Sequence, residues 1–308
     1  MIVINNLKDI QNIPPCSIAL GNFDGVHVGH QTLIAKTVEK AKELGIHSAV
    51  FTFSNHPKNL FSGENVVKNI IYQDEKAALI EKLGVDYLFN VEFTHEVART
   101  SPIRFIDDLL VGKMNLREAF CGFNYHFGYK AEGNPQLLRQ HGLTKGFHVN
   151  EIEPVTIDGD VVSSTLIRGL IRSGDMEECQ RYLGRWYSIG GEVVVGNRLG
   201  RTIGFPTSNI MIDENMVTPP NGVYITNCIY NGNKYSSITN VGVKPTIGEF
   251  RKNMETHIFN FNKELYGKHI QIEFLKMTRE EAKFSSVEEL SAQIIRDCEE
   301  AKAYHGLI

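Results

Sequence analysis

The chain has 308 residues, of which 42% are hydrophobic and 22% charged, as expected for a soluble globular protein of about two domains. Its 32 Lys and Arg against 36 Asp and Glu give a net charge of -4, which argues against a dedicated nucleic-acid binder and a polybasic membrane anchor. The five cysteines form no CxxC pair, so we expect no disulfide framework or structural zinc site, and a cytoplasmic location. We also expect no signal peptide and no membrane-spanning helix.

The first half of the chain predicts strands that alternate with helices. The expected strands are residues 17–20, 48–53 and 87–91, and the expected helices are 29–44 and 74–83, with Asp74 as a cap. Ser101-Pro102 and Asn134-Pro135 each place a capping side chain before a proline, which predicts two more helix starts. We expect Gly142 to end the second of these helices. This alternation predicts a parallel, doubly wound sheet.

The second half, after Gly184, predicts short strands separated by Gly, Asn and Pro clusters. The expected strands are residues 193–195, 222–225, 235–238 and 269–274. Their spacing is typical of a small antiparallel barrel or sandwich. A final helix is predicted by a capping box, Ser286 with Glu289, followed by an apolar stripe of Leu290, Ile294, Cys298 and Ala301. We therefore expect two domains, residues 1–183 and 184–308.

A glycine-bracketed turn followed by two histidines is the strongest local signal. Residues 21–30, GNFDGVHVGH, lie between the first expected strand and the first expected helix. Gly21 and Gly25 allow close approach of a ligand, and the free N–H groups of a helix start favour a polyphosphate. His27 and His30 project to the same side, where they can stabilise charge that develops during transfer. A turn whose histidines only cap the helix is less favoured, and two histidines without nearby ligands make a poor zinc site.

Two further segments have chemistry that spacing alone does not settle. Ser163-Ser164-Thr165 can present hydroxyls to a phosphate that Arg168 reaches one turn later, although a plain capped helix fits equally well. Residues 196–209, GNRLGRTIGFPTSN, lack P-loop spacing but can cradle phosphates through backbone N–H groups. Thr207 and Asn209 would face the same side of a strand as oxygen ligands for Mg²⁺. From spacing alone, an ordinary glycine-proline hairpin is slightly favoured for this segment.

The first half resembles the HxGH nucleotidylyltransferases, and specifically the N-terminal module of bacterial bifunctional riboflavin kinase/FMN adenylyltransferases, or FAD synthetases. The similar segments, in order, are residues 21–34, 51–57, 122–128 and 163–168. The resemblance implies a Rossmann-like domain that joins FMN to AMP. It implies nucleotide-binding roles for Gly21, Asn22, Phe23, Asp24, Gly25, Ser164 and Thr165, flavin-binding roles for Asn124, Tyr125 and Phe127, and catalytic roles for His27, His30 and Arg168.

The second half resembles riboflavin kinase, in which residues 196–209 match the nucleotide and magnesium segment apart from Ser208. The resemblance implies a β-barrel that phosphorylates riboflavin. It implies nucleotide binding by Gly200, Gly204 and Pro206, Mg²⁺ binding by Thr207 and Asn209, and flavin binding by Arg279 and Phe284. Glu255 is similar to the family's catalytic base, and as a lone residue it would be taken for a solvated strand carboxylate.

The first half departs from the family pattern at two places. Leu166 stands where the family often has a second arginine, and Ser54-Asn55 precede His56 where the family often has an acidic residue and a proline. One active module, the kinase, is therefore the first alternative. A flavin- or nucleotide-sensing protein without catalysis, and adenylyl transfer to another phosphate acceptor, are the others. The preferred hypothesis, two active modules, implies riboflavin, FMN, FAD and ATP as ligands and neither nucleic acid nor membrane as a partner.

Overall fold

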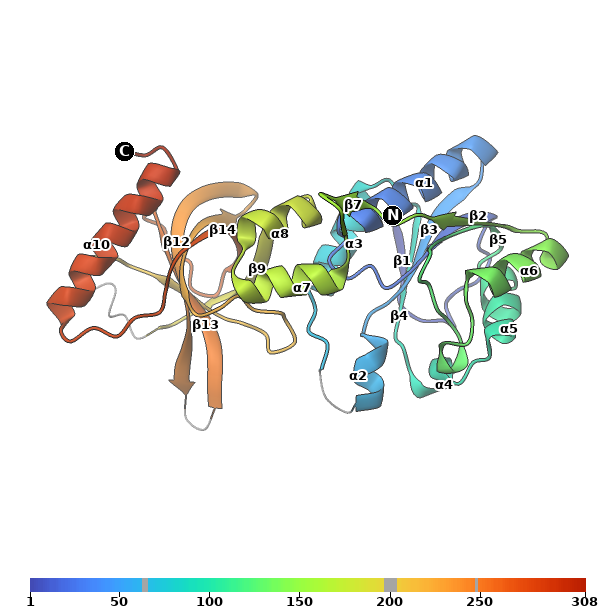
Figure 1. Ribbon diagram of the computed structural model, residues 1–308, viewed down its shortest axis with the longest axis horizontal. Coiled ribbons are helices and arrows are strands. Elements are labelled where there is room, and N and C mark those ends of the chain that lie inside the picture. The colour runs from blue at the N-terminus through green and yellow to red at the C-terminus, as the bar shows by residue number, and fades with distance from the viewer. Residues whose placement is uncertain (63–65, 197–203, 247–248) are drawn as a thin grey trace. The chain divides into compact units, whose positions relative to one another are not determined.

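The computed structural model describes residues 1–62, 66–196, 204–246 and 249–308 (Figure 1). They pack into two units, Met1–Ser164 and Thr165–Ile308. Helices α7 (Ser164–Ser173) and α8 (Met176–Leu183) precede the barrel strands, and α8 packs on strands β9 and β14, whose bounds are given below. By packing, these helices group with the second unit, so the contacts divide the chain at the start of α7. The domain boundary after residue 183 stays a prediction.

The sheet of the first unit confirms the predicted parallel α/β architecture. Its strands pair in the order β1 (Ile2–Ile4), β4 (Tyr87–Val91), β3 (His47–Phe53), β2 (Cys16–Leu20), β5 (Leu116–Gly122) and β6 (His148–Ile152), and every pairing is parallel. From β2 the chain passes to β3 on one side and later to β5 on the other. The order of the strands thus reverses at β2, and ligands of such sheets bind outside the carboxyl ends at this point.

The helices of the first unit are α1 (Val28–Leu44), α2 (Pro57–Ser62), α3 (Gln73–Lys82), α4 (His95–Ala98), α5 (Pro102–Arg104), the π-helix η1 (Phe105–Val111), the 3₁₀-helix η2 (Tyr129–Ala131) and α6 (Pro135–Lys145). Two of them, α5 and α6, begin at the predicted Ser-Pro and Asn-Pro start signals. A hairpin of β7 (Thr156–Ile157) and β8 (Asp160–Val161) completes the unit. As predicted, the Ser101 and Asn134 side chains accept hydrogen bonds from backbone N–H groups three residues later.

Two predicted details of these helices are wrong. The α6 helix continues past Gly142 to Lys145 and ends at Gly146, which adopts the left-handed conformation at φ 75°. Gly142 stays inside the helix, where a side chain would meet the carbonyl oxygen of Phe147. Asp74 lies in the first turn of α3, and the capping position is Tyr72, whose side chain makes no capping bond.

One hydrophobic cluster of the first unit lies on the face of the sheet that η1 and α6 cover. Cys16, Ile18 and Leu20 of β2 alternate along the strand and pack in one cluster with Phe105 of η1 and Leu138 of α6. Helix α1 packs on β2, β3 and β5. The central strands are therefore buried along most of their length, as parallel strands usually are.

The second unit is a closed antiparallel barrel, which confirms the predicted second architecture. Its strands follow the order β10 (Ser208–Met211), β13 (Glu249–Ile258), β12 (Asn233–Thr246), β11 (Gly222–Tyr230), β14 (His269–Glu280) and β9 (Tyr187–Val194). Each strand pairs with a neighbour on both sides, so the ring of strands is closed. Within the described residues, no helix of either unit is both long and apolar enough to cross a membrane.

The last helix, α10 (Val287–Tyr304), lies on the outside of the barrel (Figure 1). The Ser286 hydroxyl accepts from the Glu289 N–H at 3.2 Å, as the capping box predicts. The Glu289 carboxylate instead accepts from the backbone and hydroxyl of Ser285. Cys298 and Ala301 of the predicted stripe are buried against barrel residues, so the helix closes a second hydrophobic core.

Candidate active sites

The turn of residues 21–26 joins the carboxyl end of β2 to α1 and has an unusual backbone. Phe23 and Val26 adopt φ angles of 48° and 38°, a left-handed conformation that costs about 1–3 kcal/mol for such side chains. The Asp24 carboxylate accepts the Ile70 N–H, with oxygen distances of 3.0 and 3.2 Å. The Ser164 hydroxyl donates to the Asp24 carbonyl at 2.9 Å. The surrounding chain therefore fixes this turn in a conformation that the sequence alone would not favour.

The two glycines of the turn fit closely against neighbouring side chains. A Cβ atom on Gly21 would lie 3.0 Å from the Phe23 ring, and one on Gly25 would lie 3.1 Å from Ile70. Gly25 also has a φ of 86°, which an L side chain rarely adopts. Their predicted role in nucleotide binding stays a prediction, as do those of Asn22, Phe23 and Asp24.

His27 and His30 form a stacked pair at the start of α1, which confirms that they project to the same side. Their ring centroids are 3.5 Å apart with an interplanar angle of 17°. His27 is the N-cap residue, and its Nδ1 accepts from the His30 N–H at 3.2 Å. Because Nδ1 accepts, a neutral His27 carries its proton on Nε2. The helix start thus offers imidazoles together with the positive end of its dipole.

The predicted phosphate-binding segment is divided between the two units. Ser164 reaches the turn through its bond to the Asp24 carbonyl. Thr165 and Arg168 lie on α7 in the second unit, and Arg168 is buried. Their placement relative to the histidines therefore stays a prediction.

The predicted flavin loop follows β5, the neighbour of β2 in the sheet. The rings of Tyr125 and Phe127 stack with centroids 5.5 Å apart. Phe127 is buried against Phe105 of η1 at 5.2 Å, whereas Asn124 is exposed. Phe127 thus supports the loop from the core, and Asn124 and Tyr125 are more accessible to a ligand. The loop lies on the same carboxyl edge as the turn, and the three flavin-binding roles stay predictions.

In the barrel, strand register brings Asn209 and Glu255 together. Asn209 of β10 pairs directly with Glu255 of β13, so their side chains lie on the same face. The Asn253 amide donates to the Glu255 carboxylate at 3.3 Å. The Asn209 side-chain oxygen is buried and has no hydrogen-bond partner among the described residues. A side chain on Gly196 would collide with the Asn209 amide, so the glycine leaves the space around this oxygen open.

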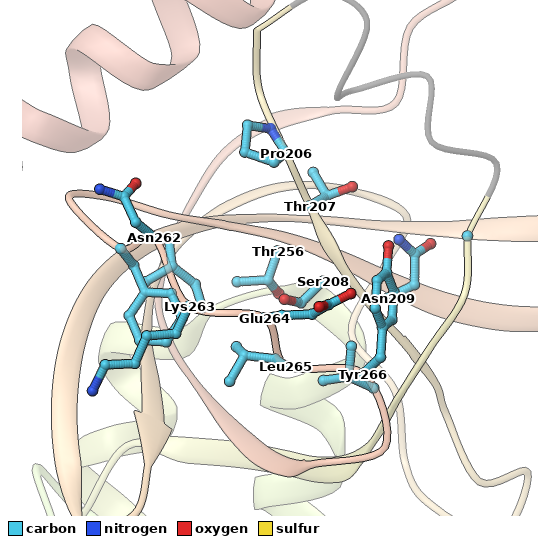
Figure 2. A pocket seen from close by; sticks show the side chains of 14 residues that line it. Pro206, Thr207, Ser208, Asn209, Thr256, Asn262, Lys263, Glu264, Leu265 and Tyr266 are labelled. Atoms are coloured by element: carbon cyan, nitrogen blue, oxygen red, sulfur yellow. The ribbon is translucent and has the colours of Figure 1, made fainter.

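A pocket of about 400 Å³ contains both predicted metal ligands (Figure 2). Thr207 and Asn209 come from one segment, together with Pro206 and Ser208. Strand β13 adds Thr256, and the loop between β13 and β14 adds Phe261, Asn262, Lys263, Glu264 and Tyr266. Of the other residues predicted to bind the nucleotide in this half, Gly204 has a φ of 87°, and Gly200 lies outside the described residues. An oxygen pair beside a pocket of this size suits a metal-bound nucleotide.

His257 contacts the Pro206 segment that lines this pocket, a role that the sequence did not reveal. Its Nδ1 lies 2.8 Å from the Pro206 carbonyl oxygen, which can only accept, so Nδ1 carries the proton. The ring also packs edge-on against Phe205 and Phe259. Burial lowers the pKa of His257, and either protonation state keeps the Nδ1–H bond. His257 therefore ties β13 to the segment that carries Thr207.

Arg279 and Phe284 lie together, but a carboxylate that the sequence did not reveal binds the arginine. The Arg279 guanidinium is 5.7 Å from the Phe284 ring centroid. Two of its nitrogens donate to the buried Asp297 of α10, the shortest bond being 2.7 Å. Arg279 thus anchors the last helix to the barrel, and its flavin-binding role, like that of Phe284, stays a prediction.

Comparison with known proteins supports both halves of the sequence analysis. The FAD synthetase family matches residues 9–166, and the riboflavin kinase family matches residues 183–305. A crystal structure described as a macrolide-efflux protein from Streptococcus pneumoniae is 30% identical and covers 98% of each chain with a TM-score of 0.88. That description concerns the other protein, and the likeness shows a shared two-unit fold.

Curated relatives match the chain over nearly its full length. Bifunctional riboflavin kinase/FMN adenylyltransferases of Bacillus subtilis and Haemophilus influenzae are 37% and 35% identical, over 93% and 94% of this chain and 92% and 94% of theirs. That of Escherichia coli K12 is 33% identical over 100% of this chain and 99% of its own. The chain belongs to the family of bifunctional riboflavin kinase/FMN adenylyltransferases.

Proposed function

We propose that the two units catalyse two consecutive ATP-using reactions. The barrel transfers the γ-phosphate of ATP to the 5′-hydroxyl of riboflavin, giving FMN and ADP. The parallel α/β unit then joins FMN to AMP, giving FAD and pyrophosphate. The observation that carries the proposal is that each unit has its own group of candidate catalytic residues. These are the stacked histidines in one unit and the Asn209–Glu255 pair beside a pocket in the other.

In the kinase step, Glu255 acts as the general base. The riboflavin hydroxyl oxygen attacks the γ-phosphorus, its proton passes to the Glu255 carboxylate, and the bond to the β-phosphate oxygen breaks. The Asn253 amide bonded to Glu255 orients the carboxylate. ATP occupies the pocket, with its phosphates at the end formed by Thr207 and Asn209.

Mg²⁺ fits the donor set of the barrel. The buried Asn209 oxygen is a hard ligand that lacks a partner among the described residues, and the Thr207 hydroxyl lines the same pocket. These two residues would hold the ion, which when bound neutralises charge on the transferring phosphoryl group.

In the adenylyl step, the FMN phosphate is already a nucleophile and needs no strong base. Its oxygen attacks the α-phosphorus of ATP, and pyrophosphate leaves. The turn and the start of α1 position the triphosphate, while His27, His30, Ser164, Thr165 and Arg168 stabilise the departing charge. Asn124 and Tyr125 hold the flavin at the neighbouring edge of the sheet. The substrates and products are therefore riboflavin, ATP, FMN and FAD, and the five buried, unpaired cysteines support a cytoplasmic location.

A product assay tests this function. Purified protein is given riboflavin, ATP and Mg²⁺, and the flavins are separated by chromatography. We expect FMN first and FAD later, and FAD directly when FMN replaces riboflavin. FMN without FAD from either substrate would leave the kinase as the single active module, and flavin binding without any product would indicate a sensing protein.

The bond from His257 to Pro206 gives a prediction for the kinase. His257→Phe keeps the ring but removes the donor, so the Thr207 segment is held less firmly. We expect the KM for ATP in riboflavin phosphorylation to rise roughly 3–10-fold, the value of one hydrogen bond. Steady-state kinetics measure it, and His257→Gln, which restores a donor, is the matched control. An unchanged KM in the Phe variant would show that the bond does not position Thr207.

A further inference from the structure

Lys76 is a buried cation close to the turn of residues 21–26, and neither proposed mechanism uses it. It lies in the first turn of α3 with a relative exposure of 3%, and among the described residues it is the only lysine so deeply buried. Ile80, one turn later, is also buried, so both residues lie on the inner face of α3. A buried ammonium requires partners inside the protein.

The Lys76 ammonium connects α3 to the turn through β3. Its Nζ donates to the Phe53 carbonyl at 2.8 Å and lies 3.4 Å from the Thr52 hydroxyl oxygen. That hydroxyl donates to the Asn22 carbonyl at 2.9 Å. A chain of hydrogen bonds therefore runs from Lys76 through Thr52 to the first residues of the turn, at the carboxyl edge where ligands of this fold bind.

The same segment holds the turn at a second point. Ile70, which precedes α3, donates its backbone N–H to the Asp24 carboxylate. Asn22 and Asp24 flank Phe23, one of the two strained non-glycine residues of the turn. Residues 70–76 thus fix the turn on both sides of its first strained residue.

The charge of Lys76 does not stabilise the fold. Burial lowers the pKa of Lys76 to about 8, an effect that the negative charge of Asp24 opposes. A folded-state pKa below the unfolded value means that folding disfavours the ammonium form, and this cost is fully present below pH 8. The contacts from β3, Thr52 and Phe53, are uncharged. The charge instead strengthens the Lys76 hydrogen bonds, because an ionised donor bonds roughly twice as strongly as a neutral one.

We propose that Lys76 is a positioning residue for adenylyl transfer, which holds residues 21–26 in the ligand-binding conformation through Thr52 and Asn22. It acts through the turn and does not itself touch the substrates. The inference rests on the proposed FMN adenylylation by the first unit.

Three variants test the proposal in the full-length protein, with FMN and ATP as substrates. Lys76→Met removes the donor at nearly constant shape, and we expect kcat/KM for FAD formation to fall roughly 10–100-fold, the value of hydrogen bonds from a charged donor. Lys76→Arg keeps a cation and should retain most of the activity. Lys82→Met, an exposed lysine of the same helix, is the matched control and should change nothing. Riboflavin phosphorylation by all three should equal that of the wild type.

The pH profile separates positioning from a merely structural role. We expect wild-type FAD formation to fall above about pH 8, because the neutral amine of Lys76 is a weaker donor to Thr52 and Phe53 than the ammonium. The Arg variant should keep its activity there, since arginine stays charged. A shared alkaline fall in both proteins would overturn the proposal.

Failure of the proposed function and failure of the proposal for Lys76 give different results. If the wild type makes no FAD from FMN, the proposed function itself fails. If the wild type makes FAD and Lys76→Met is within twofold of it, the proposal for Lys76 is wrong. Thermal unfolding accompanies each assay, and loss of both activity and stability in the Met and Arg variants alike would make Lys76 structural and overturn the proposal.

Discussion

Glu255→Gln is expected to stop FMN formation from riboflavin while leaving FAD formation from supplied FMN intact. The amide keeps the shape and the contact with Asn253 but cannot take the proton of the riboflavin hydroxyl. Loss of a general base typically costs about 10²–10⁴-fold in rate. Because Glu255 lies in the barrel and the histidine pair lies in the other unit, the adenylyl step should not respond. Chromatographic separation of FMN and FAD measures both reactions in one sample.

Glu192→Gln is the matched control for this prediction. Glu192 is an exposed carboxylate on β9, a strand of the same barrel, so its loss changes the charge equally without touching the site. Both reactions should proceed at wild-type rates in this variant. If Glu255→Gln phosphorylated riboflavin within threefold of the wild type, Glu255 would not be the base.

The parts of the fold that could be predicted have local signals. The start of α1 is one, because the glycines and His27 act within a few residues of each other and the i, i+3 spacing alone brings the two histidines together. Strands β1, β5 and β6 of the sheet were not predicted, and the two edge strands, β1 and β6, carry exposed or polar residues such as Ile2 and Glu151. Their place depends on pairing with distant strands, which no local pattern encodes.

The parts of the sites that escaped prediction depend on contacts between distant segments. In the sequence, Lys76 looks like an ordinary helix lysine. Only the apolar Ile80 one turn later indicates that Lys76 lies on the inner face of the helix. His257 meets Pro206 across 51 residues, and Asp297 meets Arg279 from another element. Tertiary packing determines which polar residues are buried. A sequence motif therefore identifies the residues that contact the ligand more easily than the residues that hold these contacts in place.

His30→Ala is expected to do the reverse of the Glu255 substitution, with loss of FAD formation from FMN and retention of riboflavin phosphorylation. His30 stacks on His27 at the positive end of α1, where charge on the departing pyrophosphate would develop. Removing one such stabilising group typically costs about 10²–10³-fold in rate. His30 is a better choice than His27, because His27 also caps the helix and its loss would cost about 1 kcal/mol of stability.

The control for His30→Ala is a histidine at the opposite edge of the same sheet. His148 is exposed at the amino end of β6, so His148→Ala should leave both reactions unchanged. The decisive comparison is the ratio of FAD to FMN formed from riboflavin, since loss of His30 should let FMN accumulate at the wild-type rate. A folded His30→Ala protein that lost both reactions would contradict independent sites. One that kept adenylylation within threefold of the wild type would place the stabilising charge elsewhere, and Arg168 would then be the residue to change.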